Sequence, residues 1–243
     1  MEVNDLIDER NGPLYKTINK QIAIELKENS DWRAETWDSR ISNKTATVLY
    51  CDCPDTATAF TKELLRIQAQ LKGFKLLADG QTNHRQPYEN MQTLIKSLNH
   101  HFLNHKIAGD FIALGYSTEQ LQEEDESTTF FLKDQLASSG HSMLKLSLFY
   151  LLLIDPLIAT TESERTMIQD LFYQYNKGKF RARLQNIDKI LQDWALADSY
   201  VAEKYMIGFL INAGVTNTRF SYQTQSYLSN EKNLPENGFF IGK

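Results

Sequence analysis

The chain has 243 residues, of which 42% are hydrophobic and 23% charged, and its formal net charge at pH 7 is −5. This composition is that of a folded globular chain, so it excludes an intrinsically disordered protein. The negative net charge argues against general binding to nucleic acid or anionic lipid over the whole surface. The length suffices for one large domain or two small ones.

Three features of the sequence predict a soluble cytoplasmic protein. Cys51 and Cys53 are the two cysteines, and residues so close together rarely pair with each other, which indicates a reducing compartment. The first five residues, M-E-V-N-D, are acidic and no apolar segment follows them, so a signal peptide is not expected. The longest apolar run, Leu146 to Ile154, has about half the length that a membrane-spanning helix needs, and it predicts a buried core helix instead.

The first part of the chain predicts a helix, a strand and a second helix. An amphipathic helix is expected from Pro13 to Leu26, because apolar residues recur there every four positions. Residues 45–51 are rich in β-branched side chains and predict a strand. A helix over 56–72 follows, with Phe60, Leu64, Ile67 and Leu71 on one stripe.

The remaining sequence predicts helices after one loop or hairpin at residues 73–87. A helix from Tyr88 to about Asn104 is expected to be followed by a shorter one that ends at Gly115. The second half reads as helices only, with a polar and aromatic tail from about Thr216. The sequence therefore predicts a mainly α protein of the α+β class, with a small sheet in the N-terminal half and a helical C-terminal half.

A domain boundary is expected near residues 138–140, where the sequence reads S-S-G. It would separate an N-terminal α+β region, residues 1–138, from a helical C-terminal region, residues 139–243. One continuous domain remains the alternative.

The predicted helix at 56–72 contains the segment that says most about function. Residues 60–67 read F-T-K-E-L-L-R-I, and they have the frame of the motif H-E-x-x-H. In that motif two histidines on one helix face hold zinc, and the glutamate between them activates water. Here only Glu63 matches the motif, because Lys62 and Arg66 stand where the two histidines would be.

The segment resembles zincin-like, metallopeptidase-like families in which a strand leads into a helix reading T-H-E-L-L-H. Lysine and arginine offer no lone pair to a metal in their charged forms. The resemblance therefore implies a metallopeptidase-like scaffold that has lost its metal ligands, with the face of Lys62, Glu63 and Arg66 bordering a cleft. The alternative is that these three side chains form the solvated face of an amphipathic helix.

Histidines are concentrated downstream of this helix, where zincin-like folds commonly supply a third metal ligand. His100, His101 and His105 belong to this group, and His101 and His105 are four residues apart, so they share a helix face and could bind a metal together. Two imidazoles without a clear third ligand make a poor metal site. The favoured interpretation is a polar helix end whose histidines lie near the negative end of the helix dipole.

A small basic cluster lies in the second half of the chain, interleaved with aromatic residues. Basic residues and aromatic rings together can bind nucleic acid. In an acidic protein, however, a solvated helix face is the favoured interpretation of such a cluster. Its cations are Lys177, Lys179, Arg181 and Arg183.

Three functions of different classes remain open. The first is an interaction or regulatory protein on a metallopeptidase-like scaffold without metal ligands. The second is a purely helical scaffold protein without enzyme ancestry. The third is a metal-dependent hydrolase that uses Glu63 with His101 and His105. We predict the non-enzymatic role that the first two share: binding of another protein, without metal or cofactor, and without a membrane or nucleic-acid partner.

Overall fold

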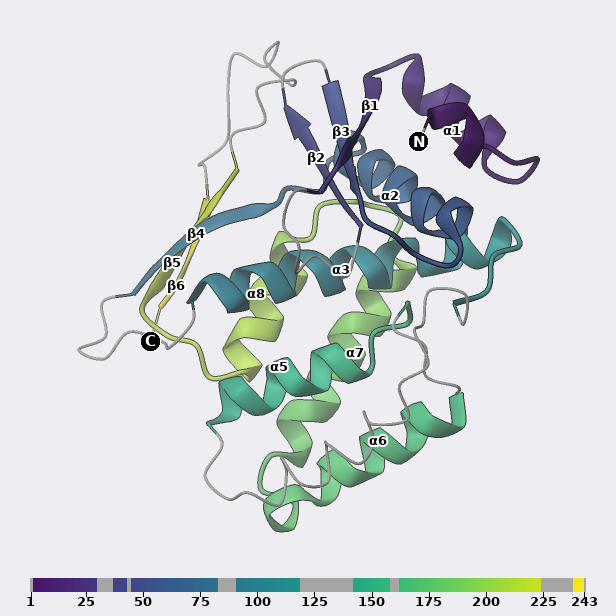
Figure 1. Cartoon of the computed structure of the whole chain (residues 1–243). Coiled ribbons are helices and arrows are strands. Elements are labelled where there is room, and N and C mark those ends of the chain that lie inside the picture. Colours follow the sequence, from purple (N-terminus) through teal and green to yellow (C-terminus); the bar gives the residue numbers. More distant parts are fainter. Residues whose placement is uncertain are drawn as a thin grey trace.

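The computed structural model of the chain describes residues 2–29, 37–42, 45–82, 91–118, 142–157, 162–223 and 238–242. Within these ranges it confirms the predicted α+β class, since seven α-helices are accompanied by two three-stranded sheets (Figure 1). The first sheet lies at one end of the molecule with α2, the helix α6 lies at the other end, and α3 crosses between them. The helices are α1 (Gly12–Asn19), α2 (Thr56–Leu71), α3 (Met91–Ala113), α5 (Met143–Leu153), α6 (Glu162–Gln174), α7 (Arg181–Leu196) and α8 (Glu203–Asn212).

The first sheet contains the predicted strand at its centre. Its order is β1 (Ala23–Glu28), β3 (Thr45–Tyr50) and β2 (Asp38–Ser42), with β1 parallel and β2 antiparallel to β3. Ala46 and Val48 are fully buried, because alternate side chains of β3 point toward the helix layer. They pack in one apolar cluster with Phe60 and Leu64 of α2.

The prediction of one helix from Pro13 to Leu26 is wrong. The helix α1 ends at Asn19, and β1 begins at Ala23. Ile22, Ile24 and Leu26 are spaced two residues apart, which is the period of a strand. Ile22 and Leu26 are also four residues apart, so the same residues fit the spacing of a helix equally well. Pairing of β1 with β3 decides between the two patterns.

A second sheet joins residues that are far apart in sequence. β4 (Leu77–Thr82) pairs antiparallel with β5 (Thr218–Tyr222), which pairs antiparallel with β6 (Gly238–Ile241). In place of the loop or hairpin predicted at 73–87, the described residues 73–82 contain a single strand whose partner is distant in sequence, and residues 83–87 lie outside the described ranges. The prediction of a second half made only of helices is wrong. Phe220 and Phe239 are buried and stack with ring centroids 5.3 Å apart, so the aromatic residues of the tail supply the buried face of this sheet.

The predicted pair of helices between Tyr88 and Gly115 is one helix, α3, within the part that the structure describes. Gly109 lies inside this helix. A single glycine lowers helix stability by only about 1 kcal/mol, and this cost is too small to end a helix that packs against other elements on both sides. The chain leaves the helix at Gly115, which has a φ of +85°. This left-handed conformation is one that glycine adopts without steric cost.

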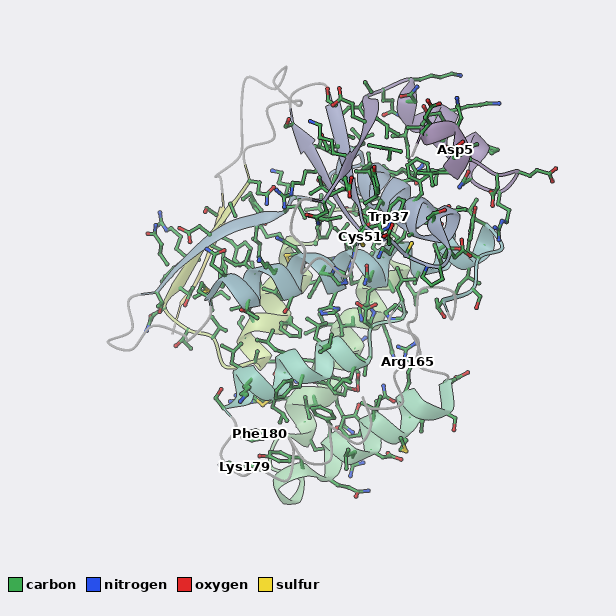
Figure 2. The ribbon with its side chains drawn as sticks, viewed as in Figure 1. Asp5, Trp37, Cys51, Arg165, Lys179 and Phe180 are labelled. Carbon is green, nitrogen blue, oxygen red and sulfur yellow. The ribbon has the colours of Figure 1, made fainter. Side chains whose placement is uncertain are left out.

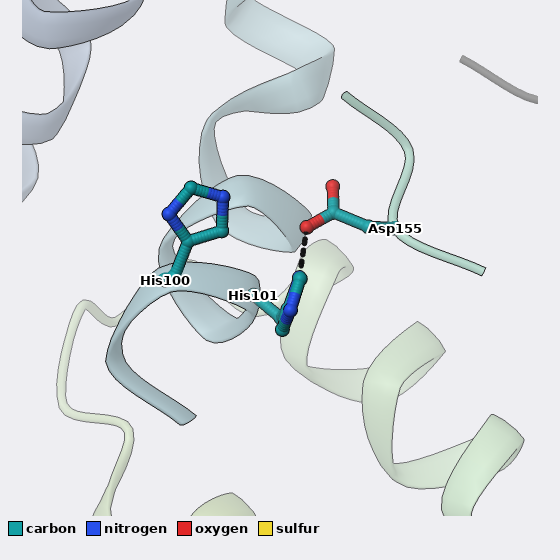
Figure 3. Close-up of side chains that lie close together, drawn as sticks. All are labelled: His100, His101 and Asp155. Atoms are coloured by element: carbon teal, nitrogen blue, oxygen red, sulfur yellow. Dashed lines mark hydrogen bonds and ion pairs between the residues drawn. The ribbon is translucent and has the colours of Figure 1, made fainter. Parts of the chain in front are cut away.

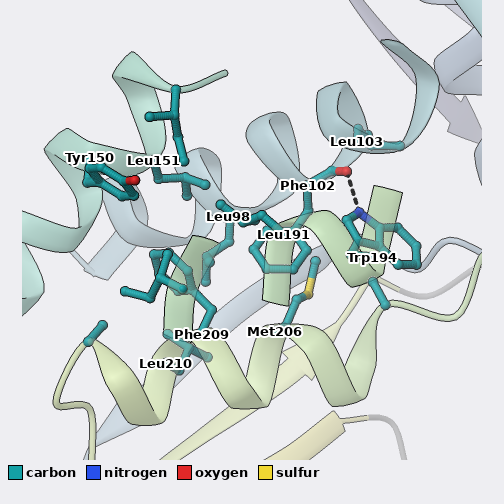
Figure 4. Close-up of a cluster of buried hydrophobic side chains, with 14 of the residues drawn as sticks. Leu98, Phe102, Leu103, Tyr150, Leu151, Leu191, Trp194, Met206, Phe209 and Leu210 are labelled. Carbon is teal, nitrogen blue, oxygen red and sulfur yellow. Dashed lines mark hydrogen bonds between the residues drawn. The ribbon is translucent and has the colours of Figure 1, made fainter. Parts of the chain in front are cut away.

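The apolar run predicted as a core helix is α5, and the burial of its side chains confirms the prediction. Leu146, Tyr150 and Leu151 are fully buried. Figure 4 shows Tyr150 and Leu151 within the cluster of buried side chains. All three belong to one apolar cluster that extends from Leu65 in α2 to Ile241 in β6. The boundary predicted near residues 138–140 lies outside the described residues, and none of the described helices has the length and apolar character needed to span a membrane.

The burial of α5 can be tested with two adjacent leucines. Leu151→Asp should abolish the cooperative thermal unfolding transition, because it would bury an unpaired carboxylate. Leu152 is 42% exposed, so the same change there should cost less than about 1 kcal/mol. Circular dichroism melts of the two variants measure the difference, and equal melting temperatures would contradict this placement of α5.

Candidate functional site

The polar residues of the motif segment on α2 are buried. Lys62 is 9% exposed, Glu63 0% and Arg66 4%. The helix packs against the first sheet with its apolar stripe and against α3 with its polar side, so neither side faces water. The interpretation of these three residues as a solvated helix face is therefore wrong, and the cause is the packing of α3 against the polar side.

Arg66 is the centre of a buried group of polar side chains between α2 and α3. Its Nη1 donates to Glu63 Oε1 at 3.1 Å, and its Nη2 donates to Asn104 Oδ1 at 2.7 Å. The same Nη2 lies 2.8 Å from His100 Nδ1. Because a guanidinium can only donate, His100 Nδ1 must be the unprotonated acceptor. One side chain of α2 therefore binds its own helix and two successive turns of α3.

Asp155, which follows α5, connects a third part of the chain to this group. Its Oδ2 accepts hydrogen bonds from Asn104 Nδ2 at 2.8 Å and from His101 Nδ1, and its Oδ1 accepts from the backbone N–H of Leu157 at 2.9 Å. Figure 3 shows the His101 imidazole directed at this carboxylate and the His100 ring beside the ring of His101. We call the whole group the Arg66-centred network. It consists of Lys62, Glu63, Arg66, His100, His101, Asn104 and Asp155.

The Arg66-centred network contains charges of both signs. Burial and the neighbouring Arg66 guanidinium lower the pKa of the Lys62 ammonium, although Lys62 also lies 3.7 Å from Glu63 Oε1. Burial and Arg66 together hold the pKa of His100 well below its usual range, so this imidazole is neutral. Burial opposes ionisation of Asp155, yet the hydrogen bond from His101 and the electrostatic interaction with it bring the pKa of Asp155 to about 2. The carboxylates of Glu63 and Asp155 therefore lie among side chains that can pair with a negative charge.

The residues do not fit the zinc ion that the resemblance to metallopeptidases would imply. Among the described residues, His100, His101 and Asp155 offer ligand atoms that all lie within 4.8 Å of one another. The Arg66 guanidinium, however, lies against His100 and would repel a dication there. In addition, the ligand atoms of His101 and Asp155 are already hydrogen-bonded to each other.

The structure separates the three histidines predicted as a possible metal or polar cluster. His100 and His101 lie in the Arg66-centred network, in the middle of α3 and away from its end. The interpretation as a polar helix end near the dipole is therefore wrong. His105 lies one turn further along α3, is 7% exposed, and its Nε2 has no hydrogen-bond partner among the described residues.

The basic cluster lies apart from this site. Lys179, Arg181 and Arg183 are exposed, as expected for a solvated face, and the side chain of Lys177 lies outside the described residues. Cys51 and Cys53 are both half-buried and form no disulfide, and burial raises the pKa of Cys53.

Sequence reasoning missed Asn104 and Asp155. Asn104 occurs three and four residues after His101 and His100, so it shares their helix face, which is a signal that spacing alone could have given. Asp155 follows the apolar run of α5 and precedes a proline, and that pattern also describes an ordinary helix end.

Comparisons with known proteins add no relative to this description. No protein-family model matches the chain, no curated protein matches it, and no solved structure matches its fold.

The cost of removing Arg66 tests the burial of the network. Arg66→Ala should lower the free energy of unfolding by about 3–5 kcal/mol, because the buried Glu63 carboxylate would lose its main counter-charge. Arg40 pairs with Asp38 at 3.3 Å but its side chain is 73% exposed, so Arg40→Ala should cost no more than about 1 kcal/mol. Urea denaturation measures both values. Equal losses in the two variants would contradict a buried network.

Stability should also fall as the pH drops from about 6.5 to about 4, with His105 as one cause. Burial lowers the pKa of His105 from 6.5 to about 4. In this window the unfolded chain binds a proton that the folded chain does not, so acid favours unfolding. Compared with His105→Gln, the wild type should lose on the order of 3 kcal/mol more stability across the window.

Urea denaturation across the pH range measures this difference between the two proteins. The comparison with the variant is needed because burial raises the pKa of Asp188 from 3.8 to about 6, which acts in the opposite direction over most of the window. A difference that stays constant with pH would show that His105 titrates normally in the folded protein.

Proposed function

We propose that this chain is a non-enzymatic interaction or regulatory protein on a metallopeptidase-like helix pair, in which an arginine takes the place of the metal. The observation that supports this is the position of the Arg66 guanidinium. It lies between Glu63 of α2 and His100 and Asn104 of α3, at distances of 2.7 to 3.1 Å. One fixed cation thereby joins the glutamate of the motif segment to the histidine-bearing helix.

A fixed cation at this position opposes metal-dependent hydrolysis. A hydrolytic metal must accept both protein ligands and a water molecule, and it acts through its own positive charge. Here Arg66 already supplies the positive charge, and both Arg66 and Lys62 lie against Oε1 of the Glu63 carboxylate, the group that would have to activate water. We therefore assign the network a structural role, which is to hold α2 against α3, and no catalytic role.

The geometry does not favour the hydrolase that would use Glu63 with His101 and His105. His101 is held by Asp155, and His105 is not in the group of possible metal ligands found among the described residues. A helical scaffold without enzyme ancestry stays an alternative, because the same network would stabilise it equally well.

We further propose that the protein acts in the cytoplasm by binding another protein, without a cofactor. The net charge of −5 and the two cysteines, which form no disulfide, support this. The exposed cations Lys179, Arg181 and Arg183 are read as a solvated face, so nucleic acid is not part of the proposal.

Zinc content tests the proposal and separates it from both alternatives. Wild-type protein dialysed against zinc should retain well below one zinc per chain, because Lys62 and Arg66 cannot act as ligands. The double variant Lys62→His with Arg66→His restores two imidazoles at i and i+4 on the side that faces α3, and it should retain about one zinc per chain. Elemental analysis measures both, and thermal unfolding with and without zinc shows whether each protein is folded.

A matched control is Lys16→His with Lys20→His, which places two exposed imidazoles at the same spacing on α1 and should not retain zinc after dialysis. Stoichiometric zinc in the wild type would favour the hydrolase. A zinc-free double variant that is folded would remove the metallopeptidase-like part of the proposal and leave the helical scaffold.

A further inference from the structure

A cavity of about 480 Å³ lies beside α3, beyond the Arg66-centred network. It is bounded by α3, α6 and α7 and by the segments that follow α5 and α7. Its volume lies in the range of small-molecule sites. The residues that matter for the argument are His105, Lys106, Asp110, Arg165, Asp188 and Asp198.

The lining of the cavity includes an imidazole nitrogen that lacks a partner among the described residues. His105 lines the cavity and is 7% exposed, and its Nε2 is buried without a hydrogen bond in the part of the chain that the structure describes. A buried polar atom without a hydrogen bond destabilises the folded state. A ligand that hydrogen-bonds to this nitrogen would remove this destabilisation.

Arg165 brings a positive charge close to His105. It is half-buried, and its charge acts on both His105 and Asp188. Figure 2 shows Arg165 directed from α6 toward the body of the molecule. Asp188 is hydrogen-bonded by the Tyr150 hydroxyl and by Gln169, and Arg165 makes no ion pair within the described ranges. A guanidinium that lines a cavity in this way can bind a carboxylate through two parallel hydrogen bonds.

Two further acidic residues also line the cavity. Asp110 and Asp198 are exposed at its rim and neither is in an ion pair with a described residue, although both act on the charge of Lys106. Lys106 is already engaged, because its ammonium donates to the Ala197 carbonyl and lies 4.8 Å from the centre of the Trp194 ring. The two carboxylates therefore remain available to a cationic group of a ligand.

Apolar residues also line the cavity. Ala108, Leu191, Ala195 and Leu196 contribute to it, and they offer no hydrogen-bonding side chain. A ligand that matches this lining combines an apolar part with an anionic group for Arg165 and a cationic group for Asp110 and Asp198.

We propose that the cavity binds a short peptide with free ends, whose carboxylate pairs with Arg165 and His105 and whose ammonium lies at Asp110 and Asp198. The site is separate from the Arg66-centred network, so it can hold a peptide whether or not the network has any role in function. Recognition depends on both charges of one small molecule, with its carboxylate at Arg165 and His105 and its ammonium at Asp110 and Asp198.

Isothermal titration calorimetry of trialanine with the full-length chain tests this proposal. Trialanine with free ends should bind saturably, and its C-terminal amide should bind at least about tenfold more weakly, because it offers Arg165 no carboxylate. The N-acetyl form should lose affinity in the same way through the loss of its ammonium. Arg165→Gln should weaken binding of free trialanine by at least about tenfold, and Arg183→Gln, an exposed α7 variant that is not part of the cavity, should leave it unchanged.

Absence of saturable trialanine binding, or equal affinity for the free and amidated forms, would overturn the proposed site. Equal losses in Arg165→Gln and Arg183→Gln would overturn it as well, because they would indicate general charge attraction. Mass spectrometry of the peptide after incubation separates this result from the function proposed above. Cleaved trialanine would overturn the non-enzymatic role and leave the site in place, whereas unbound trialanine would remove the site and leave that role untouched.

Discussion

The ion pair between Arg66 and Glu63 is the interaction on which the arrangement of the helices depends. It lies where α2 faces α3, and through Asn104 it continues to Asp155 at the end of α5. Charges taken out of water cost several kcal/mol each unless they are paired and fully hydrogen-bonded. Only one relative position of these three segments pairs them, so the network specifies that position while the apolar clusters provide the stabilisation.

The helix α2 contributes to both apolar clusters of the described residues, and for this reason its polar side matters for the packing of the protein. Leu64 and Ile67 pack with the first sheet, whereas Leu65 and Ala69 belong to the larger cluster with α3 and α5. A helix with apolar contacts on two sides has little surface left for water. Its charged residues must therefore find partners inside the protein, and the Arg66-centred network supplies them from α3 and from Asp155, although Glu63 Oε2 and Arg66 Nε have no hydrogen-bond partner among the described residues.

Much of the fold could be predicted from local patterns, and the site could be predicted only in part. Local sequence patterns suffice to predict three elements: the helix α2 from its periodicity, the strand β3 from its β-branched residues, and the helix α5 from its apolar run. They do not suffice for the pairing of β4 with β5, because its partners lie in opposite halves of the chain. The burial of Arg66 was missed for a related reason: sequence patterns assign lysine, glutamate and arginine to the surface, and only the packing of α3 shows otherwise. The resemblance to H-E-x-x-H helices directed attention to the right residues, while His100 and Asp155 acquire their roles only from tertiary contacts.

The most direct measurement of the central claim is a crystal structure of the chain soaked in zinc, with anomalous diffraction recorded at the zinc absorption edge. The account predicts no anomalous peak between α2 and α3, and an Arg66 guanidinium in contact with Glu63, His100 and Asn104. An anomalous peak coordinated by His100, His101 and Asp155, with the Arg66 side chain displaced from His100, would contradict it.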